Sequence, residues 1–331
     1  MEPVRVASIG LGWWGGTLAE KAADAGLRIV SCYSRTEEQR TQFAQTHGGV
    51  AATSVEAVLS DPDVEGVLIA TPHSTHADFV VEVAAAGKHI FVDKPFTLGV
   101  AEAKRAIAAA DSAGVVLQVG HNRRRQPANR RLKEMIDAGD LGTLQYAEAN
   151  LSNPRGLNPR TGWRGDPAES PAGGMTGLGV HMADNLHYLL GPAARVAAFS
   201  KKVLQIGTLD NATTATIEYH SGPLAFLGTS TVVPDIARTA VWGTEGAAWN
   251  ELDGEKFYVQ RTGEPERTAQ PVDAIDTVRD ELAEFAANIR DGGRPETGGA
   301  EALEAVAVLE GIVESAATGR VVDLDEVRAR E

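Results

Sequence analysis

A glycine-rich stretch near the start of the sequence has the spacing of a phosphate-binding loop. The run "GLGWWG" begins at Gly10, directly after the strand-like run "VRVASIG" and directly before a helical pattern over residues 16–26. In that setting Gly10 makes a tight turn, Gly12 lets the backbone approach a pyrophosphate, and Gly15 allows the helix to pack closely on the strand. The helix N-terminus adds free N–H groups and a positive dipole for the anion. We therefore expect a nicotinamide dinucleotide to bind here; the alternative is a merely glycine-rich turn.

The residues that follow the second strand-like run bear on which dinucleotide binds. An acidic residue about 20 positions after the glycines usually binds the ribose 2′-hydroxyl of NAD. Ser34 and Arg35 stand in that place here, and an arginine can bind a phosphate bidentately. We therefore expect NADP to be the preferred cofactor, with NAD as the alternative. Glu37 and Glu38 lie close by and could supply the missing acid, although the first turn of the next helix is the better place for them.

A lysine stands just beyond the end of another strand-like run. The tetrapeptide "DKPF", which contains Lys94, follows "KHIFV". In open parallel sheets ligands lie beyond the carboxyl ends of the strands, so Lys94 is expected at the ligand edge. An ammonium group there could polarise a carbonyl or stabilise a developing alkoxide beside a hydride carrier. The alternative is a lysine that extends from the strand end into solvent.

The first third of the chain alternates between strand and helix patterns. Strands are expected at residues 4–10, 27–34, 64–71, 89–92 and 115–120, and helices at 16–26, 36–48, 75–88 and 99–114. This alternation predicts βαβ units with right-handed crossovers. The fold expected over residues 1–120 is therefore an α/β Rossmann domain with a parallel, doubly wound sheet.

The pattern changes after about residue 121. Helices are expected at residues 127–142, 174–191, 282–290 and 299–319, strands at 194–205, 212–222, 223–233, 238–250 and 256–262, and a loop at 152–174. Successive strands separated by glycine-containing turns predict an antiparallel arrangement. Residues 121–331 are therefore expected to form an α+β C-terminal domain with a largely antiparallel sheet.

Composition limits the classes of partner. The formal net charge of −14 disfavours nucleic acid, because phosphate binding needs a basic field. The local exception "RRRQPANRR", residues 123–131, is expected to be a solvated helix start, with a phosphate-bearing ligand as the alternative. No apolar run approaches the roughly 18 residues of a membrane span, and no residue is assigned to a metal site. The first residues lack a secretory pattern and Cys32 is the single cysteine, so we expect a cytoplasmic protein.

Several motifs together resemble one known family. Besides the glycine loop they are "ATPHSTHADFVVEVAAAGKHIFVDKPF" at residues 70–96, "QVGHNRRRQPANRRLKEMIDAGDLG" at 118–142 and "GGMTGLGVHMADNLHYLLG" at 173–191. They are similar to the glucose–fructose oxidoreductase, inositol dehydrogenase and rhizopine-catabolism (Gfo/Idh/MocA) oxidoreductase family, and the resemblance covers nearly the whole chain. It implies a Rossmann domain followed by a domain with an open, mostly antiparallel sheet. It also implies hydride transfer between NAD(P) and a hydroxyl or keto carbon, commonly of a sugar or cyclic polyol.

The resemblance extends to single cofactor-binding residues. The usual Glu-Lys-Pro motif of the family reads Asp-Lys-Pro here, which implies that Lys94 lies near the nicotinamide and the substrate. Thr71, Pro72 and His76 match a segment that lines the nicotinamide side in the family. The expected cofactor-binding set is Gly10, Gly12, Trp13, Trp14, Gly15, Ser34, Arg35, Thr71, Pro72, His73, His76, Asp93 and Lys94.

A histidine in the predicted helix at 174–191 is the candidate acid and base. Family members commonly carry an aspartate four residues before this histidine; here His181 is present, and Gly177 occupies the aspartate position. Asp184 also matches a family position and could orient His181 or bind substrate. Helical spacing places these residues and Tyr188 on one face. An imidazole exchanges a proton near neutrality, with an ordinary pKa of about 6.5, whereas the alternative for His181 is a core histidine with satisfied hydrogen bonds.

Four further residues are candidates for substrate binding. Trp163 and Arg164 resemble a tryptophan–arginine step that many relatives place near the ligand. A tryptophan face suits a sugar ring, and an arginine suits hydroxyls or a carboxylate. Asn122 and Arg123 follow the strand-like run at 115–120 and so lie at its ligand edge. The alternative for Trp163 and Arg164 is an ordinary surface loop.

The sequence thus predicts an NAD(P)-dependent dehydrogenase or reductase acting on a small sugar-like or polyol-like molecule. His181 would exchange the hydroxyl proton, Lys94 would stabilise charge on the oxygen, and Asp184 would support them. Two alternatives are a cofactor-retaining enzyme that cleaves glycosides and a non-catalytic dinucleotide sensor, which Gly177 favours. An open sheet with an apolar face predicts a homodimer or homotetramer.

Overall fold

The computed structural model describes residues 2–331, which divide into two compact units. The first unit contains the described residues up to 97, together with 101–122 and 276–303. The second contains 98–100, 123–275 and 304–331. Segment 276–303, which the sequence places in the second domain, therefore belongs to the first unit.

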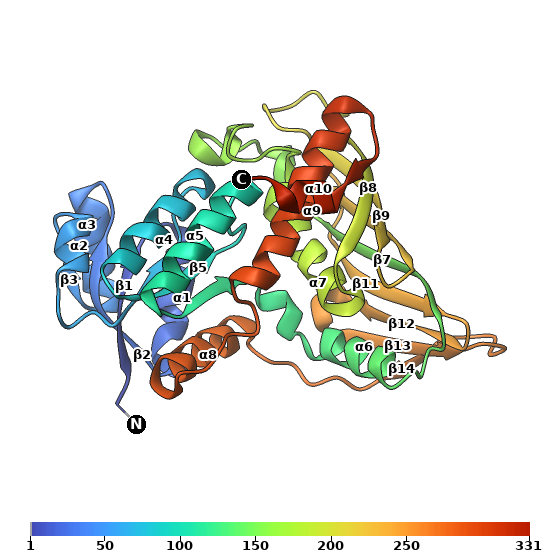
Figure 1. The fold of residues 1–331 in the computed structure, drawn as a ribbon, viewed down its shortest axis with the longest axis horizontal. Coiled ribbons are helices and arrows are strands. Elements are labelled where there is room, and N and C mark those ends of the chain that lie inside the picture. Colours follow the sequence, from blue (N-terminus) through green and yellow to red (C-terminus); the bar gives the residue numbers. More distant parts are fainter. Residues whose placement is uncertain (1) are drawn as a thin grey trace. The chain divides into compact units, whose positions relative to one another are not determined.

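The first unit is built on a parallel sheet, which confirms the predicted Rossmann fold (Figure 1). Its strands are β1 (Val4–Ile9), β2 (Leu27–Tyr33), β3 (Val50–Ala51), β4 (Gly66–Ile69), β5 (His89–Asp93) and β6 (Leu117–Gly120). Their order across the sheet is β3-β2-β1-β4-β5-β6, with every pair parallel. The order reverses between β1 and β4, and ligands bind at such a switch point.

Helices of the first unit bury apolar faces against this sheet. They are α1 (Trp13–Ala22), α2 (Glu37–His47), α3 (Val55–Leu59), α4 (His76–Ala85), α5 (Val100–Ala113) and α8 (Thr277–Asp291). The late helix α8 lies beside α1 and β2 (Figure 1). Its Phe285 is fully buried and meets Phe91 of β5, with ring centroids 5.8 Å apart. Arg290 donates to the Gly26 carbonyl at 2.8 Å, which ties the helix end to the start of β2.

The second unit is built on a mixed, mostly antiparallel sheet, as expected. Its strands are β7 (Leu144–Ser152), β8 (Ala193–Lys201), β9 (Ala212–Tyr219), β10 (Leu224–Ser230), β11 (Ile236–Gly243), β12 (Gly246–Glu251), β13 (Lys256–Arg261), β14 (Thr268–Gln270) and β15 (Val322–Asp323). The order is β14-β13-β12-β11-β7-β10-β9-β8-β15. Among the described strands of this second sheet, only β7 and β10 form a parallel pair.

Strand β7 is the main element that the sequence did not predict. It lies at the centre of the sheet between β10 and β11, yet its sequence "LQYAEANLS" contains no β-branched residue. Ala147, Ala149 and Leu151 point inward and are buried. Short inward side chains let the helices approach this strand closely, but they give a weak strand signal.

Helices cover one face of the second sheet. They are α6 (Pro127–Asp137), α7 (Val180–Leu190), α9 (Gly299–Thr318) and the short α10 (Leu324–Ala329). Asn129 of α6 accepts from the Asn250 amide of β12 at 2.8 Å, and Ser315 of α9 accepts from the Ala198 N–H of β8 at 2.9 Å. No helix within residues 2–331 is both long enough and apolar enough to cross a membrane.

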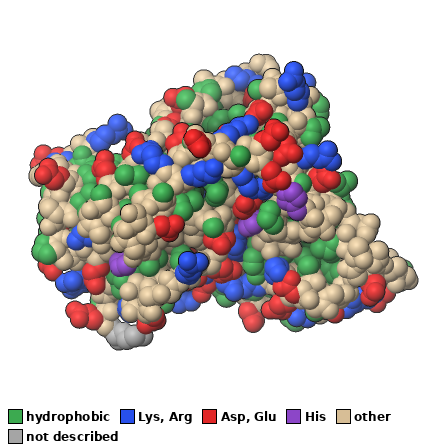
Figure 2. Space-filling model, in the orientation of Figure 1, with side chains coloured by type: hydrophobic (Ala, Val, Ile, Leu, Met, Phe, Trp, Pro, Cys, Tyr) green, Lys and Arg blue, Asp and Glu red, His purple; other side chains and the backbone are tan. Residues whose placement is uncertain are grey.

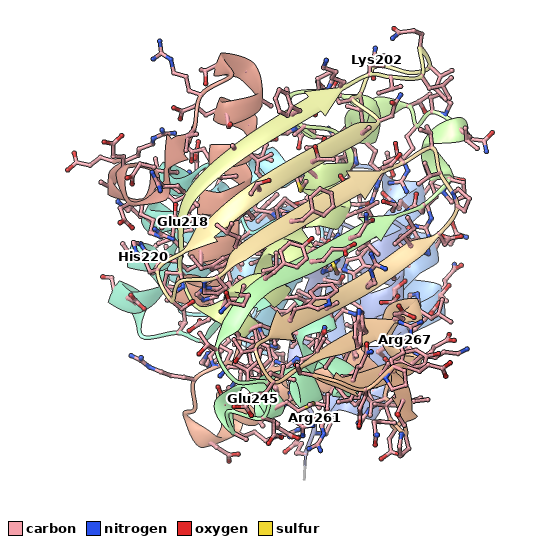
Figure 3. The ribbon with its side chains drawn as sticks, turned by 90° about the vertical axis from the view of Figure 1, so that its right-hand side faces the viewer. Lys202, Glu218, His220, Glu245, Arg261 and Arg267 are labelled. Carbon is pink, nitrogen blue, oxygen red and sulfur yellow. The ribbon has the colours of Figure 1, made fainter. Side chains whose placement is uncertain are left out.

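The opposite face of the second sheet carries a row of aromatic side chains (Figure 3). Ring centroids of Tyr146 and Trp242 lie 5.0 Å apart, and those of Trp242 and Trp249 lie 5.8 Å apart. The Arg267 guanidinium lies 4.1 Å from the centroid of Tyr258. Cross-strand aromatic pairs of this kind stabilise neighbouring strands.

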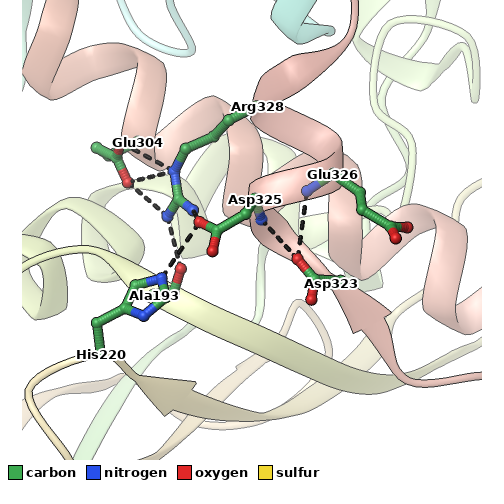
Figure 4. A network of polar contacts seen from close by, with 7 residues as sticks. All are labelled: Ala193, His220, Glu304, Asp323, Asp325, Glu326 and Arg328. Atoms are coloured by element: carbon green, nitrogen blue, oxygen red, sulfur yellow. Dashed lines mark hydrogen bonds and ion pairs between the residues drawn. The ribbon is translucent and has the colours of Figure 1, made fainter.

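Arg328 ties the C-terminal helix to its neighbours (Figure 4). Arg328 donates to the Glu304 carboxylate at 2.7 Å, to Asp325 at 2.7 Å and to the Ala193 carbonyl at 2.6 Å. Its side chain is only 16% exposed. Because charged hydrogen bonds in partly buried places are the strong ones, Arg328 fixes α10 to α9 and to the start of β8.

Candidate active site

The glycine loop has the geometry of a dinucleotide-binding turn. Gly10 has φ +91°, and a Cβ there would collide with the Ala70 carbonyl. A Cβ on Gly15 would collide with the Gly10 carbonyl. At Gly12, by contrast, a Cβ would meet no atom of the described residues within 4 Å. Two glycines are therefore required by close packing, and the third leaves room beside the backbone where a pyrophosphate fits.

Helix α1 begins at this loop. Its N-cap is Gly12, and no side chain of the described residues caps it. The first N–H groups of a helix need acceptors, which an anion can supply. Trp13 is 69% exposed beside the loop, and Gln39 of α2 donates to the Leu11 carbonyl at 3.0 Å, which steadies the turn.

The end of β2 presents hydroxyl and guanidinium groups. Ser34 is buried and donates to the Thr36 carbonyl at 3.1 Å, while Arg35 is exposed. Arg40, which the sequence did not single out, donates to the Ser34 carbonyl at 3.4 Å and brings a second cation to this loop. Glu37 and Glu38 lie in the first turn of α2, as the sequence favoured, where they complement the helix dipole.

Histidine 76 joins the loops that follow β4 and β5. Its ring is fully buried, with Nδ1 2.9 Å from the Pro95 carbonyl and Nε2 3.1 Å from the Thr71 carbonyl. Burial lowers the pKa of His76, and the neighbouring Asp93 carboxylate opposes that shift. His76 therefore positions the segment that carries Lys94. Pro72 begins the short turn His73–Thr75, and His73 meets the His76 ring edge-on at 5.9 Å.

The remaining candidates of the first unit also follow strand ends. Asp93 is the last residue of β5 and pairs in register with Gly120 of β6, so Lys94 comes directly beyond the sheet. Both Asp93 and Lys94 are half-buried. Asn122 donates to the Thr277 hydroxyl of α8 at 2.8 Å. The first unit thus gathers Gly12, Ser34, Thr71, Lys94 and Asn122 at the carboxyl edge of its sheet, which agrees with the predicted ligand edge.

His181 and Asp184 belong to the second unit, on α7. A π-helical turn, Met175–Gly179, leads directly into this helix. His181 is 7% exposed, and Met182, Leu186 and Leu189 form the buried apolar side of α7. The histidine is therefore held on a rigid element.

The Asp184 carboxylate is bound by a buried arginine that the sequence did not single out. Arg124 donates from Nη2 to Oδ1 at 2.6 Å and from Nε to Oδ2 at 3.1 Å, and the two side chains are 4% and 1% exposed. The guanidinium also lies 5.2 Å from the Tyr188 ring centroid. Burial, and then the charge of Arg124, lower the pKa of His187 one turn away. Asp184 is thus a partner of Arg124, although the two residues are 60 positions apart in the sequence. No local sequence pattern predicts this pairing.

The arginine-rich stretch at residues 123–131 differs from the solvated helix start that was expected. Arg124 and Arg125 are buried, and Arg123 is 20% exposed at its side chain. Arg123 forms an ion pair with Asp253, to which Gln126 also donates at 2.6 Å. The prediction was wrong for these arginines, because they precede α6 in a 3₁₀ turn that packs into the unit.

Trp163 and Arg164 pack on each other. The Arg164 guanidinium lies 4.1 Å from the Trp163 ring centroid, and both side chains are half-buried. This cation–π contact rigidifies the turn Gly162–Gly165.

Gly177 is not required by the fold. A Cβ at Gly177 would meet no described atom within 4 Å, whereas a Cβ at Gly179 would collide with the Met175 side chain and lie 3.0 Å from Thr229. We expect Gly177→Ala to raise the free energy of unfolding by about 0.5–1 kcal/mol, because alanine restricts the unfolded chain. Gly179→Ala should lower it by about 1–3 kcal/mol through overpacking. Urea denaturation of both variants checks this, and equal destabilisation would contradict it.

Comparisons with known proteins identify the family of this chain. Residues 4–121 match a family model described as an oxidoreductase family with an NAD-binding Rossmann fold, and residues 129–249 match the GFO/IDH/MocA C-terminal domain. A scyllo-inositol 2-dehydrogenase (NAD(+)) of Bacillus subtilis is 33% identical over 257 residues, 74% of this chain and 72% of that protein. A 1,5-anhydro-D-fructose reductase of Ensifer adhaerens is 28% identical over 91% of this chain and 92% of that one.

A solved structure matches the whole fold. It is described as a candidate NADPH-dependent oxidoreductase from Desulfitobacterium hafniense, with 34% identity, a TM-score of 0.94 and coverage of 99% of this chain and 100% of that one. The two family models, these relatives and this solved structure all indicate one oxidoreductase family. The chain belongs to the Gfo/Idh/MocA family and is an NAD(P)-dependent oxidoreductase.

Proposed function

We propose that this oxidoreductase acts on a hydroxyl or keto carbon of a sugar or cyclic polyol and prefers NADP. The observation that carries the cofactor assignment is the glycine loop, where Gly10 and Gly15 are packed tightly while Gly12 leaves open space at an uncapped helix N-terminus. The substrate class is supported by the relatives, one named for an inositol and one for an anhydro sugar.

We assign the following roles in the reaction to residues of this chain. The bound nicotinamide supplies or accepts the hydride. His181 accepts the hydroxyl proton during oxidation and returns it during reduction, and Lys94 stabilises negative charge on the substrate oxygen. Asp184 holds Arg124 and so supports the helix that carries His181. Trp163, Arg164, Asn122 and Arg123 remain our candidates for substrate contacts.

The test of the function is reduced-nicotinamide absorbance with NADP+ and NAD+ in parallel across sugars, inositols and glycosides. We expect reduction of the cofactor with at least one sugar or polyol. Sugar release from a glycoside without net cofactor turnover would instead favour a cofactor-retaining hydrolase. Nucleotide binding with no turnover of any kind, in either direction, would favour a dinucleotide sensor.

The cofactor preference has its own prediction. Arg35→Ala should weaken NADP+ binding by about 10- to 100-fold and leave NAD+ binding nearly unchanged, because only NADP carries the 2′-phosphate that a guanidinium would bind. Quenching of tryptophan fluorescence, with Trp13 beside the loop, reports both affinities without a substrate. Arg294→Ala, at another exposed arginine of the same unit, is the control. If the ratio of NADP+ affinity to NAD+ affinity is the same in Arg35→Ala as in the wild type, Arg35 does not cause the cofactor preference.

Assembly and location complete the proposal. We propose a homodimer or homotetramer formed through the aromatic face of the second sheet, because Tyr146, Trp242 and Trp249 pack on one another there. No helix of residues 2–331 lies over this face of the sheet in Figure 3. Light scattering of the wild type and of Trp242→Lys tests this assembly. We further propose that the protein works in the cytoplasm, which is consistent with a single, buried cysteine, Cys32.

A further inference from the structure

The turn between β12 and β13 has an unusual backbone conformation. Leu252 and Asp253 have φ values of +52° and +60°, and Gly254 follows with φ +96°. Residues other than glycine rarely adopt this left-handed region, because Cβ comes too close to the following carbonyl oxygen; among residues 2–331 the other example is Ala172. The Leu252 side chain is 52% exposed, so its burial does not compensate for the strain. Another contact must therefore hold the turn in this conformation.

Asp253 supplies that contact. Gln126, the N-cap of α6, donates to the Asp253 carbonyl at 3.0 Å and to the Asp253 carboxylate at 2.6 Å. The Gln126 side-chain oxygen in turn accepts from Asn250 of β12 at 2.9 Å and from Asn129 of α6 at 3.3 Å. Both asparagines are buried, and hydrogen bonds among buried side chains restrict the movement of those side chains. The Asp253 carboxylate is therefore held in one place.

This carboxylate is the partner of Arg123. The two side chains form an ion pair in which the arginine is 20% and the aspartate 47% exposed. On the face in view in Figure 2, basic and acidic side chains are interspersed, and the exposed pair of Arg131 with Glu134 is an ordinary surface pair. The Arg123 pair differs from such a pair, because the arginine is mostly buried and its carboxylate comes from a strained, tethered turn.

The backbone of Arg123 lies beside the helix that carries the candidate acid and base. Arg124, the next residue, donates to the Asp184 carboxylate at 2.6 Å and 3.1 Å. Asp184 lies one turn after His181 on α7, and all four residues belong to the second unit. Because we assign Arg123 to the substrate contacts, its pairing with Asp253 bears on the charge of the substrate.

We propose that Asp253 is a specificity-determining residue, which pairs with Arg123 and thereby selects neutral sugars or polyols against acidic ones. The inference rests on the proposed function, since it names the charge class of the substrate. A guanidinium has several N–H donors, and one carboxylate does not engage them all, so Arg123 can still donate to a neutral hydroxyl. A carboxylate on the substrate would instead meet an arginine that is already neutralised, and Asp253 would repel it.

The test removes the charge of Asp253 and keeps the shape of the turn. Asparagine tolerates left-handed φ values, and its side-chain oxygen can still accept from Gln126, so Asp253→Asn should fold as the wild type does. The neutral probes are glucose, galactose and myo-inositol, and the anionic probes are glucuronate and galacturonate, at equal ionic strength with NADP+ present. The ligand-dependent rise in Tm of the complete protein measures binding without requiring turnover.

We expect the wild type to bind at least one neutral probe more tightly than either uronate. In Asp253→Asn the affinity for a uronate relative to that neutral probe should rise by about 10- to 100-fold, because a charge-assisted hydrogen bond to Arg123 replaces a repulsion. Arg123→Gln/Asp253→Asn should lose this gain. Glu134→Gln removes the carboxylate of the exposed pair with Arg131 and should keep the wild-type ratio.

Several results would contradict this proposal. The wild type could bind a uronate more tightly than every neutral probe, or Asp253→Asn could gain no stabilisation from either uronate. A third such result is an equal change in the affinities for neutral and anionic probes in Asp253→Asn, which would mean that Asp253 only supports the turn.

Turnover in the same samples separates this proposal from the proposed function. The expected change in relative affinity, with no cofactor oxidation or reduction by any probe, would keep the charge selection by Asp253 and remove the enzyme assignment. Turnover of a neutral sugar with an unchanged relative affinity in Asp253→Asn would keep the enzyme assignment and remove the charge selection.

Discussion

Replacing His181 by glutamine is expected to lower kcat by about 10²- to 10⁴-fold, the range of a lost general acid–base group. An amide cannot exchange a proton near neutral pH, whereas an imidazole can. Nucleotide affinity should be nearly unchanged, because the glycine loop and the loop after β2 belong to the other unit. Steady-state rates on the first substrate identified, together with tryptophan quenching by the cofactor, measure the two effects separately.

Lys94→Met is the companion variant for the same reaction. It keeps the length and apolar stem of the side chain and removes the charge that we assign to the substrate oxygen, so kcat should fall by about 10²- to 10³-fold. His220→Gln, at an exposed histidine of the second unit, serves as the control and should behave as the wild type. Wild-type turnover in either His181→Gln or Lys94→Met would show that the corresponding residue has been wrongly assigned.

Breaking the Arg124–Asp184 pair should have the largest effect on stability. Arg124→Leu removes the guanidinium that binds a carboxylate at a position that is 1% exposed, so we expect the free energy of unfolding to fall by about 3–5 kcal/mol. Arg124→Leu/Asp184→Leu removes both charges and should recover most of that loss. Arg131→Leu, from an exposed pair with Glu134, should cost at most about 1 kcal/mol. Chemical denaturation of the four proteins measures these differences.

The double variant also defines the role of Asp184. If the carboxylate acts only by holding Arg124, turnover should return with the fold in Arg124→Leu/Asp184→Leu. If Asp184 orients His181 or contacts substrate, the double variant should fold but remain slow. Loss of stability equal in the single and double variants would contradict the ion-pair account itself.

The sequence revealed the parts of the fold that depend on local pattern. The strand–helix alternation and the spacing of Gly10, Gly12 and Gly15 predicted the parallel sheet and its ligand edge, because periodicity and backbone freedom are local properties. Strand β7 was missed, since Ala147 and Ala149 contribute buried surface only once helices pack on them. The helical pattern at 282–290 was recognised, but those residues alone do not predict against which of the two sheets Phe285 packs.

The same distinction applies to the candidate site: some of its residues could be predicted from the sequence, and others depend on long-range contacts. His181 and Lys94 could be proposed from residue type, position and family resemblance. Arg124 could not, because its burial depends on Asp184, which lies 60 residues further along the chain.

The placement of α8 in the first unit has a consequence for synthesis on the ribosome. Leu282 and Phe285 fill the core that also contains Leu68 and Phe91, so the dinucleotide-binding unit cannot close until residues up to 303 have been translated. Its last sheet strand ends at Gly120. At about 5–20 residues per second, the nascent unit would wait roughly 10–40 s with an apolar surface uncovered. Nearly the whole second sheet is made during that interval, and a chaperone that shields the first sheet would have its longest opportunity there.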